Sequence, residues 1–429
     1  MNNAVNIAML FQTIKRGDES PFVQYLSLAL RRAGFLDGIY RTFESEVEDA
    51  LKKYQQSTGI TADGVAGDDV WNNLIKYILG YEIVPYTNNL TALADNYSTT
   101  VEAIQTANPN LKEGENIVVP FGYAVVPTDV DYTYALCMAI ADGLTKRYPF
   151  VHNTVIGKSV MGKDIFSLHF GGGKRQIFIN ASHHANEWIT TPVTIKFVED
   201  FCRAYTEDGT LFGESVKMLY DTRHIFTVPL VNPDGVDLVC GALDKQSDFY
   251  LNAVKISKNY PQIPFPDGWK ANILGTDLNL NYPAGWERAR EIKYANGFTT
   301  PAPRDYVGEA PLSAPESRSM YNYTLNNDFY LTVSYHTQGG VIYWRYLNYM
   351  PQNALEIGKM LSAASGYTLE VTPEQSGYAG YKDWFISYYN RPGYTVEAGF
   401  GENPLPISDF DKIYADNLPL IISAVKNIG

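Results

Sequence analysis

The chain has 429 residues, of which 45% are hydrophobic, and a formal net charge of −13. The length exceeds that of one ordinary domain, so we expect several units and a sizeable buried core. The acidic balance argues against nucleic acid as a partner, because binding to phosphates requires a basic face. No run of about 18 apolar residues occurs, which predicts that no segment spans a membrane.

The N-terminus and the cysteines give little indication of export. Residues 1–11 lack a basic region followed by a long apolar stretch, so they do not form a standard secretory leader. The cysteines are Cys137, Cys202 and Cys240, a scattered set without metal-type spacing. We interpret them as small buried hydrophobic residues rather than as disulfide partners.

Residues 20–79 are predicted to form a compact unit of three helices. Apolar residues recur at helical spacing through Val23–Ala33, and Gly34 ends this first helix. Ser45 opens a capping-box pattern at the start of the second helix. After a turn-rich link, Asp68 is expected to cap the third helix.

Residues 80–127 are predicted to form a second small unit. A strand at 81–84 is followed by short helices at 90–94 and 101–104, and a second strand at 116–120 closes the unit. The sequence therefore predicts a βααβ arrangement after the three helices.

His184 and Glu187 form the most informative pair in the chain. They lie three residues apart, directly after the apolar run 176–180. A catalytic zinc ion takes imidazole nitrogens and a carboxylate oxygen as its three protein ligands and keeps a fourth position open for water. A histidine and a glutamate at this spacing are common by chance, so the pair indicates a zinc site only if the rest of the chain provides further ligands.

Polar residues also end three other β-rich runs. The run 225–231 stops at the turn Asn232–Gly235, and two further runs stop at His336 and Glu397. Near-continuous apolar runs separated by helical stretches indicate an α/β fold, with a mostly parallel or mixed sheet covered by helices on both faces. Ligands of such sheets bind outside the carboxyl ends of the strands. We therefore expect His336 and Glu397 to meet the His184–Glu187 pair in one crevice.

Five segments occur in the order and approximate spacing of the zinc carboxypeptidase family, which residues 128–429 therefore resemble. They are His184–Glu187, Asn232–Gly235, Gly275–Asn279, Ser334–His336 and Thr395–Glu397. The resemblance implies a zinc carboxypeptidase-like catalytic domain that binds one zinc ion and hydrolyses an amide bond.

The resemblance also implies a role for each matching residue. His184, Glu187 and His336 correspond to the zinc ligands, and Glu397 corresponds to the general base that activates water. Asp277 corresponds to a carboxylate that orients His184. That role has a physical reason, because a metal-bound histidine usually donates its other N–H to such a group.

Three positions depart from the family pattern. At Ile386, two residues after the pair Asp383–Trp384, the family has a mobile tyrosine that makes a second contact to the substrate's terminal carboxylate. Asn279 is followed by Leu280, where the family has an arginine that clamps the terminal carboxylate of the substrate; leucine cannot make this contact. Lys270 stands where the family has an arginine that stabilises the oxyanion, so it keeps the charge without the planar fork. We expect Lys270 to act in catalysis, and Asn279, Asn186 and Gln338 to contact the substrate.

The N-terminal units carry resemblances of their own. Residues 1–79 resemble the three-helix peptidoglycan-binding domain, notably at Tyr54–Gln55 and Trp71. Residues 80–127 resemble a LysM domain, a module that binds glycans containing N-acetylglucosamine. The Gly-Asp-Thr-Leu turn usual in that module is replaced here by residues 86–90.

The whole arrangement resembles the bacterial γ-D-glutamyl–diamino acid endopeptidases. The resemblance implies peptidoglycan or a muropeptide as substrate, cut between the γ-carboxyl of D-glutamate and meso-diaminopimelate or lysine. Two alternatives stay open: a metallocarboxypeptidase that releases C-terminal residues, and a catalytically inert wall-binding protein. We expect a bacterial protein that is cytoplasmic or reaches the cell wall by a non-standard route. The sequence gives no indication of its oligomeric state.

Overall fold

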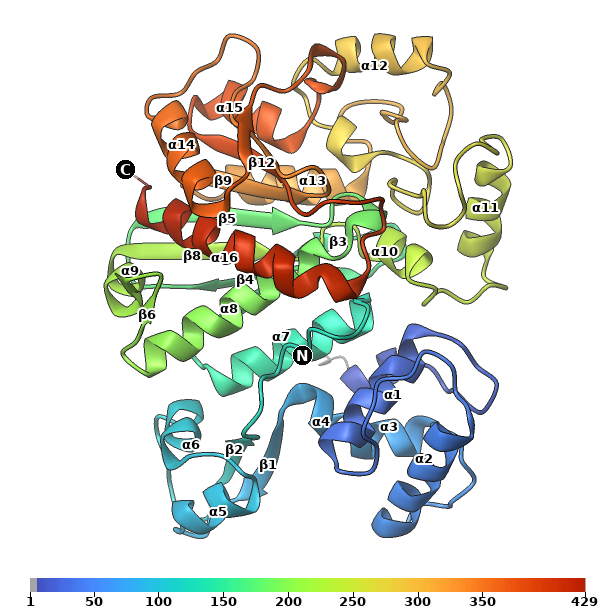
Figure 1. Cartoon of the computed structure of the whole chain (residues 1–429), viewed down its shortest axis with the longest axis vertical. Helices are drawn as coiled ribbons and strands as arrows, with labels where there is room; N and C mark the ends of the chain where they lie inside the picture. The colour runs from blue at the N-terminus through green and yellow to red at the C-terminus, as the bar shows by residue number, and fades with distance from the viewer. Residues whose placement is uncertain (1–5, 429) are drawn as a thin grey trace. The chain divides into compact units, whose positions relative to one another are not determined.

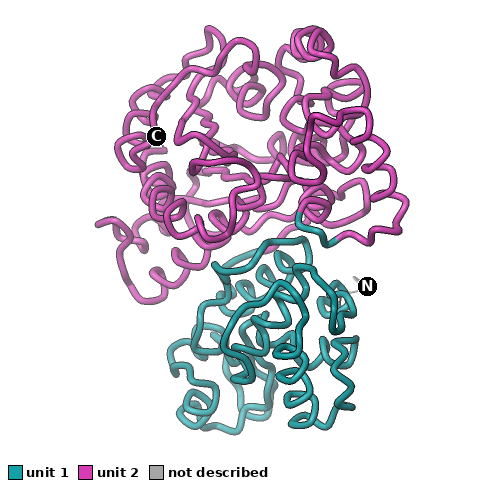
Figure 2. Tube along the Cα trace, turned by 45° about the vertical axis from the view of Figure 1, so that its right-hand side comes forward, with its two compact units in different colours: residues 1–152, 240–242 teal, residues 153–239, 243–429 magenta. Residues whose placement is uncertain are grey.

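The computed structural model describes residues 6–428. The prediction about a secretory leader concerns residues 1–11, of which the first five lie outside the described residues. Two compact units divide the chain (Figure 2). The first contains the residues up to 152 together with 240–242, and the second contains 153–239 and the residues from 243 onward. Within the described part, no helix combines the length and the apolar character that crossing a bilayer requires.

The three helices predicted for the first unit are present and share an apolar core. They are α1 (Pro21–Arg32), α2 (Ser45–Thr58) and α3 (Asp68–Leu74), preceded by the 3-10 turn η1 (Ile7–Leu10) and followed by the short α4 (Lys76–Leu79) (Figure 1). Leu26, Leu51 and Trp71 are fully buried between them. The predicted caps are wrong, since Glu44 and Gly67 hold the N-cap positions of α2 and α3 and neither helix has a side-chain cap. Acidic residues in the first turns of α2 and α3 stabilise these helix ends instead, because they lie at the positive end of the helix dipole.

The predicted βααβ order is also present in the first unit. Its elements are β1 (Tyr81–Pro85), α5 (Leu90–Asn96), α6 (Val101–Ala107) and β2 (Asn116–Pro120). The two strands pair antiparallel, with Tyr81 opposite Pro120. The Asn108 side chain fastens the turn before β2, because it accepts the Val118 N–H at 2.9 Å and donates to the Ile104 carbonyl at 2.7 Å.

Helix α7 (Tyr134–Arg147) ends the first unit and buries Cys137. The boundary between 127 and 128, drawn from the sequence, assigns this helix to the catalytic domain, whereas it falls in the first compact unit. That boundary, like the one between 79 and 80, stays a prediction. Cys137 and Cys202 are buried, in agreement with their interpretation as small buried hydrophobic residues, whereas Cys240 is only half-buried.

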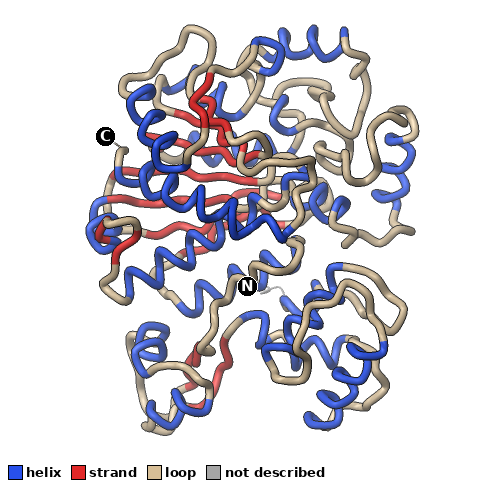
Figure 3. The backbone as a smooth tube through the Cα atoms, in the orientation of Figure 1, coloured by secondary structure: helices blue, strands red, loops and turns tan. Residues whose placement is uncertain are grey.

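The second unit is built on an eight-stranded mixed sheet, as predicted (Figure 3). In spatial order the strands are β11 (Thr368–Glu370), β10 (Val341–Tyr343), β12 (Gly393–Glu397), β9 (Phe329–His336), β5 (Arg175–Ala181), β8 (Arg223–Val228), β4 (Asp164–Phe170) and β3 (His152–Lys158). The central strands β12, β9, β5 and β8 are parallel to one another, while β10 and β4 pair antiparallel with their neighbours β12 and β8.

Helices cover both faces of this sheet (Figure 1). Phe170 on β4 packs against Phe197 on α8 (Thr190–Thr206), and Phe178 on β5 packs against Tyr381 on α15 (Tyr381–Tyr389). With α8 lie α14 (Ala354–Ser365) and α16 (Phe410–Lys426), and with α15 lies α13 (Pro315–Leu325). The remaining elements are β6 (Thr210–Leu211), β7 (Glu214–Ser215), α9 (Val216–Thr222), α10 (Pro233–Val239), α11 (Asp248–Ser257), α12 (Trp286–Ala295) and the 3-10 turns η2 (Ala185–Glu187), η3 (Leu278–Leu280), η4 (Glu374–Ser376) and η5 (Ile407–Asp409).

The carboxyl ends of the parallel strands meet at one edge of the sheet. Ala181 at the end of β5 lies opposite Tyr335 on β9, and His336 at the end of β9 lies opposite Glu397 at the end of β12. The segments that follow these strands therefore converge, as the rule for ligand sites in α/β sheets anticipates.

A buried carboxyl group under this edge makes stability depend on pH. Glu316 on α13 accepts the Val160 N–H at 3.0 Å and an Asn272 Nδ2–H at 3.1 Å, and burial raises its pKa to about 7 from the ordinary 4.5. Between pH 4.5 and pH 7, the Glu316 carboxyl group is therefore protonated in the folded chain and ionised in the unfolded chain. This contribution to the free energy of unfolding is complete below pH 4.5 and disappears as the pH rises through 7.

We expect Glu316→Gln to flatten this pH dependence, because glutamine cannot ionise. Urea unfolding at pH 5 and pH 8 should show that the wild-type chain loses about 2 to 3 kcal/mol more than the variant over this interval. Other titrating groups cancel in the comparison. An identical pH dependence in both proteins would contradict the burial argument.

Candidate metal centre

His184 and Glu187 lie in the short connection between β5 and α8. Their connection is held against a neighbouring loop by Asn232, which begins the predicted turn after β8. The Asn232 Nδ2 group donates to the His183 carbonyl at 3.1 Å and to the Ala271 carbonyl at 3.0 Å. Because Asn232 is fully buried, these two bonds fix both loops relative to the sheet.

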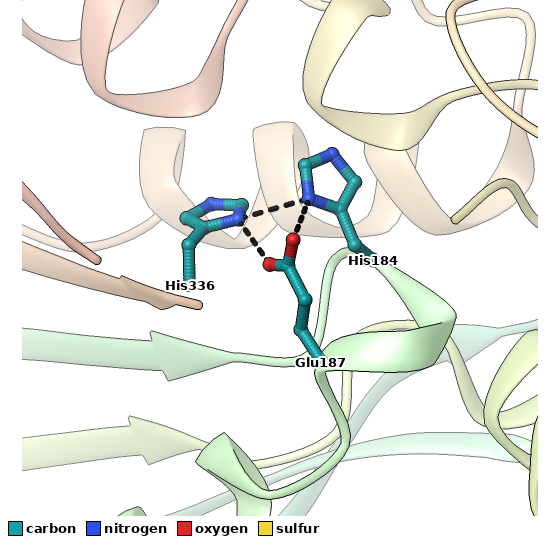
Figure 4. A group of neighbouring side chains, drawn as sticks. All are labelled: His184, Glu187 and His336. Atoms are coloured by element: carbon teal, nitrogen blue, oxygen red, sulfur yellow. Dashed lines mark hydrogen bonds and ion pairs between the residues drawn. The ribbon is translucent and has the colours of Figure 1, made fainter. Parts of the chain in front are cut away.

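The structure brings His184, Glu187 and His336 together, as predicted (Figure 4). His184 Nδ1 lies 3.0 Å from Glu187 Oε1, and His336 Nδ1 lies 2.9 Å from Glu187 Oε2. The two Nδ1 atoms are 3.1 Å apart. One potential ligand atom from each residue lies within 4.8 Å of the others, so a single cation can reach all three.

The chemistry of these three side chains fits zinc. His184 Nε2 lies 3.1 Å from Asp277 Oδ1, and this contact favours the tautomer in which Nε2 carries the proton and Nδ1 presents its lone pair. That lone pair then faces a second imidazole nitrogen and a carboxylate oxygen. Two histidines and one glutamate form a ligand set typical of catalytic zinc.

The electrostatics of the cluster also favour a positive charge. Burial opposes protonation of His184, yet the carboxylates of Glu187 and Asp277 raise its pKa to about 9. Burial likewise opposes ionisation of Asp277, but the charge and the hydrogen bond of His184 hold the pKa of Asp277 well below its usual range. Asp277 Oδ2 also accepts the Asp305 N–H at 3.1 Å, which fixes the carboxylate in place.

We expect Asp277→Asn to weaken zinc binding by about 10- to 100-fold, because the neutral amide no longer holds and polarises the His184 ring. Competition with a chromophoric chelator measures this change directly. Asp328→Asn, at a surface position far along the chain on the turn before β9, is the matched control and should bind zinc as the wild type does. Unchanged affinity in Asp277→Asn would show that the contact does not support the metal site.

Glu397 lies at the end of β12, beside His336 in the sheet register. Its side chain lines a cavity of about 250 Å³ together with His184 and Lys270. Burial raises the pKa of the Glu397 carboxyl, and the charge of Glu187 adds to this effect while His336 opposes it. The structure therefore brings the predicted base into a cavity that one member of the cluster, His184, also lines.

Lys270 lies in this cavity but is already paired. Its ammonium group contacts Glu187 Oε1 at 2.7 Å, and although burial opposes its charge, Glu187 raises the pKa of the lysine. The predicted role at the oxyanion stays a prediction. The contact with a predicted zinc ligand was not anticipated from the sequence, because it joins two loops 83 positions apart.

The three residues expected to contact the substrate lie in different surroundings. Asn279 lines the cavity, and its Oδ1 accepts the Tyr381 N–H at 3.0 Å. Asn186 is buried and donates to the Asp267 carbonyl at 2.9 Å. Gln338 is exposed. Asn186 and Gln338 are not among the residues that line the cavity in the described part of the chain.

The walls of the cavity carry charged residues that the sequence did not single out. Lys293 and Arg304 pair with Asp305 at 2.5 and 2.7 Å, and Lys382 pairs with Asp383 at 2.5 Å. Lys293 lies on α12, whereas Arg304 and Asp305 lie on the loop that follows this helix, where the sequence shows no recognisable pattern. Lys382 and Asp383 lie in the first turn of α15, where the sequence shows charge at the start of an otherwise apolar helix.

The fold and the cluster together define a zinc-dependent peptidase of the carboxypeptidase type. Residues 137–419 match the zinc carboxypeptidase family, and the chain belongs to that family. Residues 19–74 match the peptidoglycan-binding domain family. Both matches agree with the resemblances stated from the sequence.

Two similar proteins and one solved structure can be compared with this chain. The chain is 42% identical over 295 residues to gamma-D-glutamyl-L-diamino acid endopeptidase 1 of Lysinibacillus sphaericus, covering 69% of this chain and 72% of that protein. It is 38% identical over 269 residues to the uncharacterised protein YqgT of Bacillus subtilis, covering 62% of this chain and 70% of that one. Bovine thrombin-activatable fibrinolysis inhibitor aligns with a TM-score of 0.54 at 17% identity, over 70% of this chain and 98% of that structure, which confirms the fold.

Proposed function

We propose that this chain hydrolyses the bond between the γ-carboxyl of D-glutamate and a diamino acid, meso-diaminopimelate or lysine, in bacterial stem peptides. The observation that carries the proposal is the convergence of His184, Glu187 and His336 at the edge of a cavity that His184 and Glu397 both line. A relative that is 42% identical is named for this bond. The peptidoglycan-binding domain at residues 19–74 supports the cell wall, or peptides released from it, as the place of action.

In this proposal His184, Glu187 and His336 hold the zinc ion, and Asp277 keeps the His184 ring in position. Bound zinc lowers the pKa of water to about 7 and polarises the scissile carbonyl. The Glu397 carboxylate accepts a proton from the attacking water and passes it to the leaving amine of the diamino acid. Its raised pKa suits this task, because a stronger base accepts the proton more readily.

The cavity walls support a substrate with several charged groups. Leu280 lines the cavity where the family has its carboxylate-binding arginine, so the strongest contact to a free C-terminus is missing. Lys382 and Asp383 instead present a cation and an anion side by side. A diamino acid whose far end carries both an ammonium and a carboxylate group complements this pair.

Defined muropeptides test the proposal. Tripeptide, tetrapeptide and cross-linked forms should each yield fragments cut between the γ-carboxyl of D-glutamate and the amine of the diamino acid, identified by mass spectrometry. Release of single C-terminal residues with the γ-bond intact would instead identify a metallocarboxypeptidase. A purified chain that binds no stoichiometric zinc and cuts neither bond would be a catalytically inert wall-binding protein.

The proposed cleavage can take place at either of two cellular locations. Cleavage of stem peptides is compatible with recycling inside a bacterial cell and with action at the wall after release by a non-standard route. Fractionating the source cells and assaying each fraction for the γ-D-glutamyl cleavage decides between these two places.

A further inference from the structure

A second cavity adjoins the one that His184 and Glu397 line. It encloses about 350 Å³, a volume in the range of small-ligand sites. Its walls come from two segments of the second unit, 345–348 after β10 and 371–378 between β11 and α15. Thr372 lines both cavities. The segment that contains Thr372 is therefore a wall that the two cavities share.

Arg345 brings an unbalanced positive charge to this second cavity. Among the described residues it forms no ion pair, and the guanidinium makes its one polar contact through Nη1, with the Met350 sulfur at 4.0 Å. Its Nε atom is buried and has no hydrogen-bond partner in the described part of the chain. A buried donor without a partner is costly, and a guanidinium gains most from a carboxylate that accepts two of its N–H groups. The side chain is therefore suited to an anionic group that comes from outside the chain.

The other charged groups at the cavity leave the charge of Arg345 available. Glu374 lines the same cavity, but its side chain is exposed and forms no ion pair with Arg345. The Lys382 ammonium group donates to the Arg345 carbonyl at 3.0 Å and to Thr372 Oγ1 at 3.4 Å, and Asp383 balances its charge at 2.5 Å. Lys382 thus joins the two walls while its own charge stays paired. An incoming anion meets Arg345 as the unpaired cation and Glu374 as its competitor.

The place of the second cavity selects the carboxylate that can reach Arg345. Leu280, where the family binds the terminal carboxylate of the residue after the scissile bond, lines the first cavity together with Lys382 and Asp383. The diamino acid of the proposed function therefore belongs in the first cavity, and the residue that follows it extends toward the second. In a tetrapeptide stem that residue is D-alanine, which carries the free carboxylate at the end of the peptide.

We propose that Arg345 binds the terminal carboxylate of the residue that follows the diamino acid, so that the second cavity is the subsite for the D-alanine of a stem tetrapeptide. The rings of Tyr346 and Tyr378, with centroids 6.4 Å apart, provide an apolar wall suited to a methyl side chain. Arg345 contacts the substrate away from the scissile bond and therefore determines specificity. The proposal rests on the proposed function for the identity of the peptide, and on Arg345 and the cavity for the subsite.

Two peptides test the subsite without cleavage: the stem tetrapeptide that ends in D-alanine, and the same tetrapeptide with a C-terminal amide. Isothermal titration calorimetry on the full-length, zinc-loaded Glu397→Gln chain should show that the free acid binds at least about tenfold more tightly than the amide. Adding Arg345→Gln should remove this difference by weakening the free acid alone. Adding Arg345→Lys should restore part of it, because the charge returns without the planar fork.

A tripeptide and two control variants in the same Glu397→Gln background identify the group that Arg345 binds. The tripeptide ends at the diamino acid, so Arg345→Gln should leave its affinity unchanged. Glu374→Gln removes the competing anion from the same cavity and should not weaken the free acid. Arg318→Gln makes the same change as Arg345→Gln at an exposed position on α13 and should bind as the parent chain does.

Each other outcome would overturn the proposal. These outcomes are equal affinity for acid and amide in the Glu397→Gln chain, and a preference that survives Arg345→Gln. Weaker binding in Glu374→Gln would assign the cavity to an ammonium group, and weaker tripeptide binding in Arg345→Gln would assign Arg345 to the diamino acid itself. A preference that disappears in Arg318→Gln would show that the effect is not specific to the cavity.

Cleavage by the wild type is a separate measurement that distinguishes failure of this subsite from failure of the proposed function. If the wild type left the γ-D-glutamyl bond intact while the preference for the free acid depended on Arg345, the proposed function would fail and the subsite would stand. If the wild type cut that bond and the preference were absent, the subsite would fail and the proposed function would stand.

Discussion

Replacing Glu397 by glutamine is expected to reduce turnover of a stem peptide by at least about a thousandfold while the chain keeps its zinc. Glutamine has nearly the same shape but cannot accept a proton from water at its amide. The three residues that gather as the metal cluster are untouched by this change. Steady-state kinetics on a soluble tripeptide, together with metal analysis of the same sample, measures both quantities.

Glu402→Gln provides the matched control for this experiment. It makes the same chemical change at an exposed position five residues further along the chain, and it should leave turnover unchanged. If Glu397→Gln retained most of its activity, Glu397 would not be the base. If it lost its zinc, the carboxylate would belong to the ligand set instead, and the loss of activity would say nothing about proton transfer.

Replacing His336 by alanine is expected to remove stoichiometric zinc and, with it, at least about a thousandfold of the activity. A bound metal ion contributes several kcal/mol of transition-state stabilisation, and each factor of ten in rate corresponds to about 1.4 kcal/mol. His336 is buried at the end of β9, and its Nδ1 atom faces both His184 and Glu187. Inductively coupled plasma analysis after dialysis, paired with kinetics, gives the result.

Metal depletion of the wild type separates loss of the ion from loss of the fold. A chelator should abolish activity, and added zinc should restore it in the wild type but not in His336→Ala. His152→Ala changes an exposed histidine and should behave like the wild type throughout. Zinc bound at one equivalent by His336→Ala would show that the ion lies elsewhere.

The sequence predicted the convergence of the site because the rule behind it is topological. Parallel strands place their carboxyl ends at one edge, so a histidine and a glutamate that end separate apolar runs must become neighbours. His336 and Glu397 lie opposite each other in the sheet for this reason. The helices and strands of the N-terminal unit were predictable for a similar reason, since their apolar residues repeat with a clear period.

The parts that escaped prediction lack any such period. Strands β10 and β11 contain three residues each, which is too short to show alternation. The predicted helix caps were wrong by one residue, since Glu44 and Gly67 hold the N-cap positions directly before Ser45 and Asp68. The pairing of Lys270 with Glu187 and of Arg304 with Asp305 depends on how loops fold over the sheet edge, and loop conformation leaves no repeat in the sequence.

The contact between Lys270 and Glu187 has a consequence for how the charge of the site is balanced. A buried carboxylate without a counter-charge is costly, and many small zinc proteins unfold when the ion is withheld. Here an ammonium group only 2.7 Å away already balances Glu187. Neutralisation of this buried carboxylate therefore does not depend on a metal ion alone.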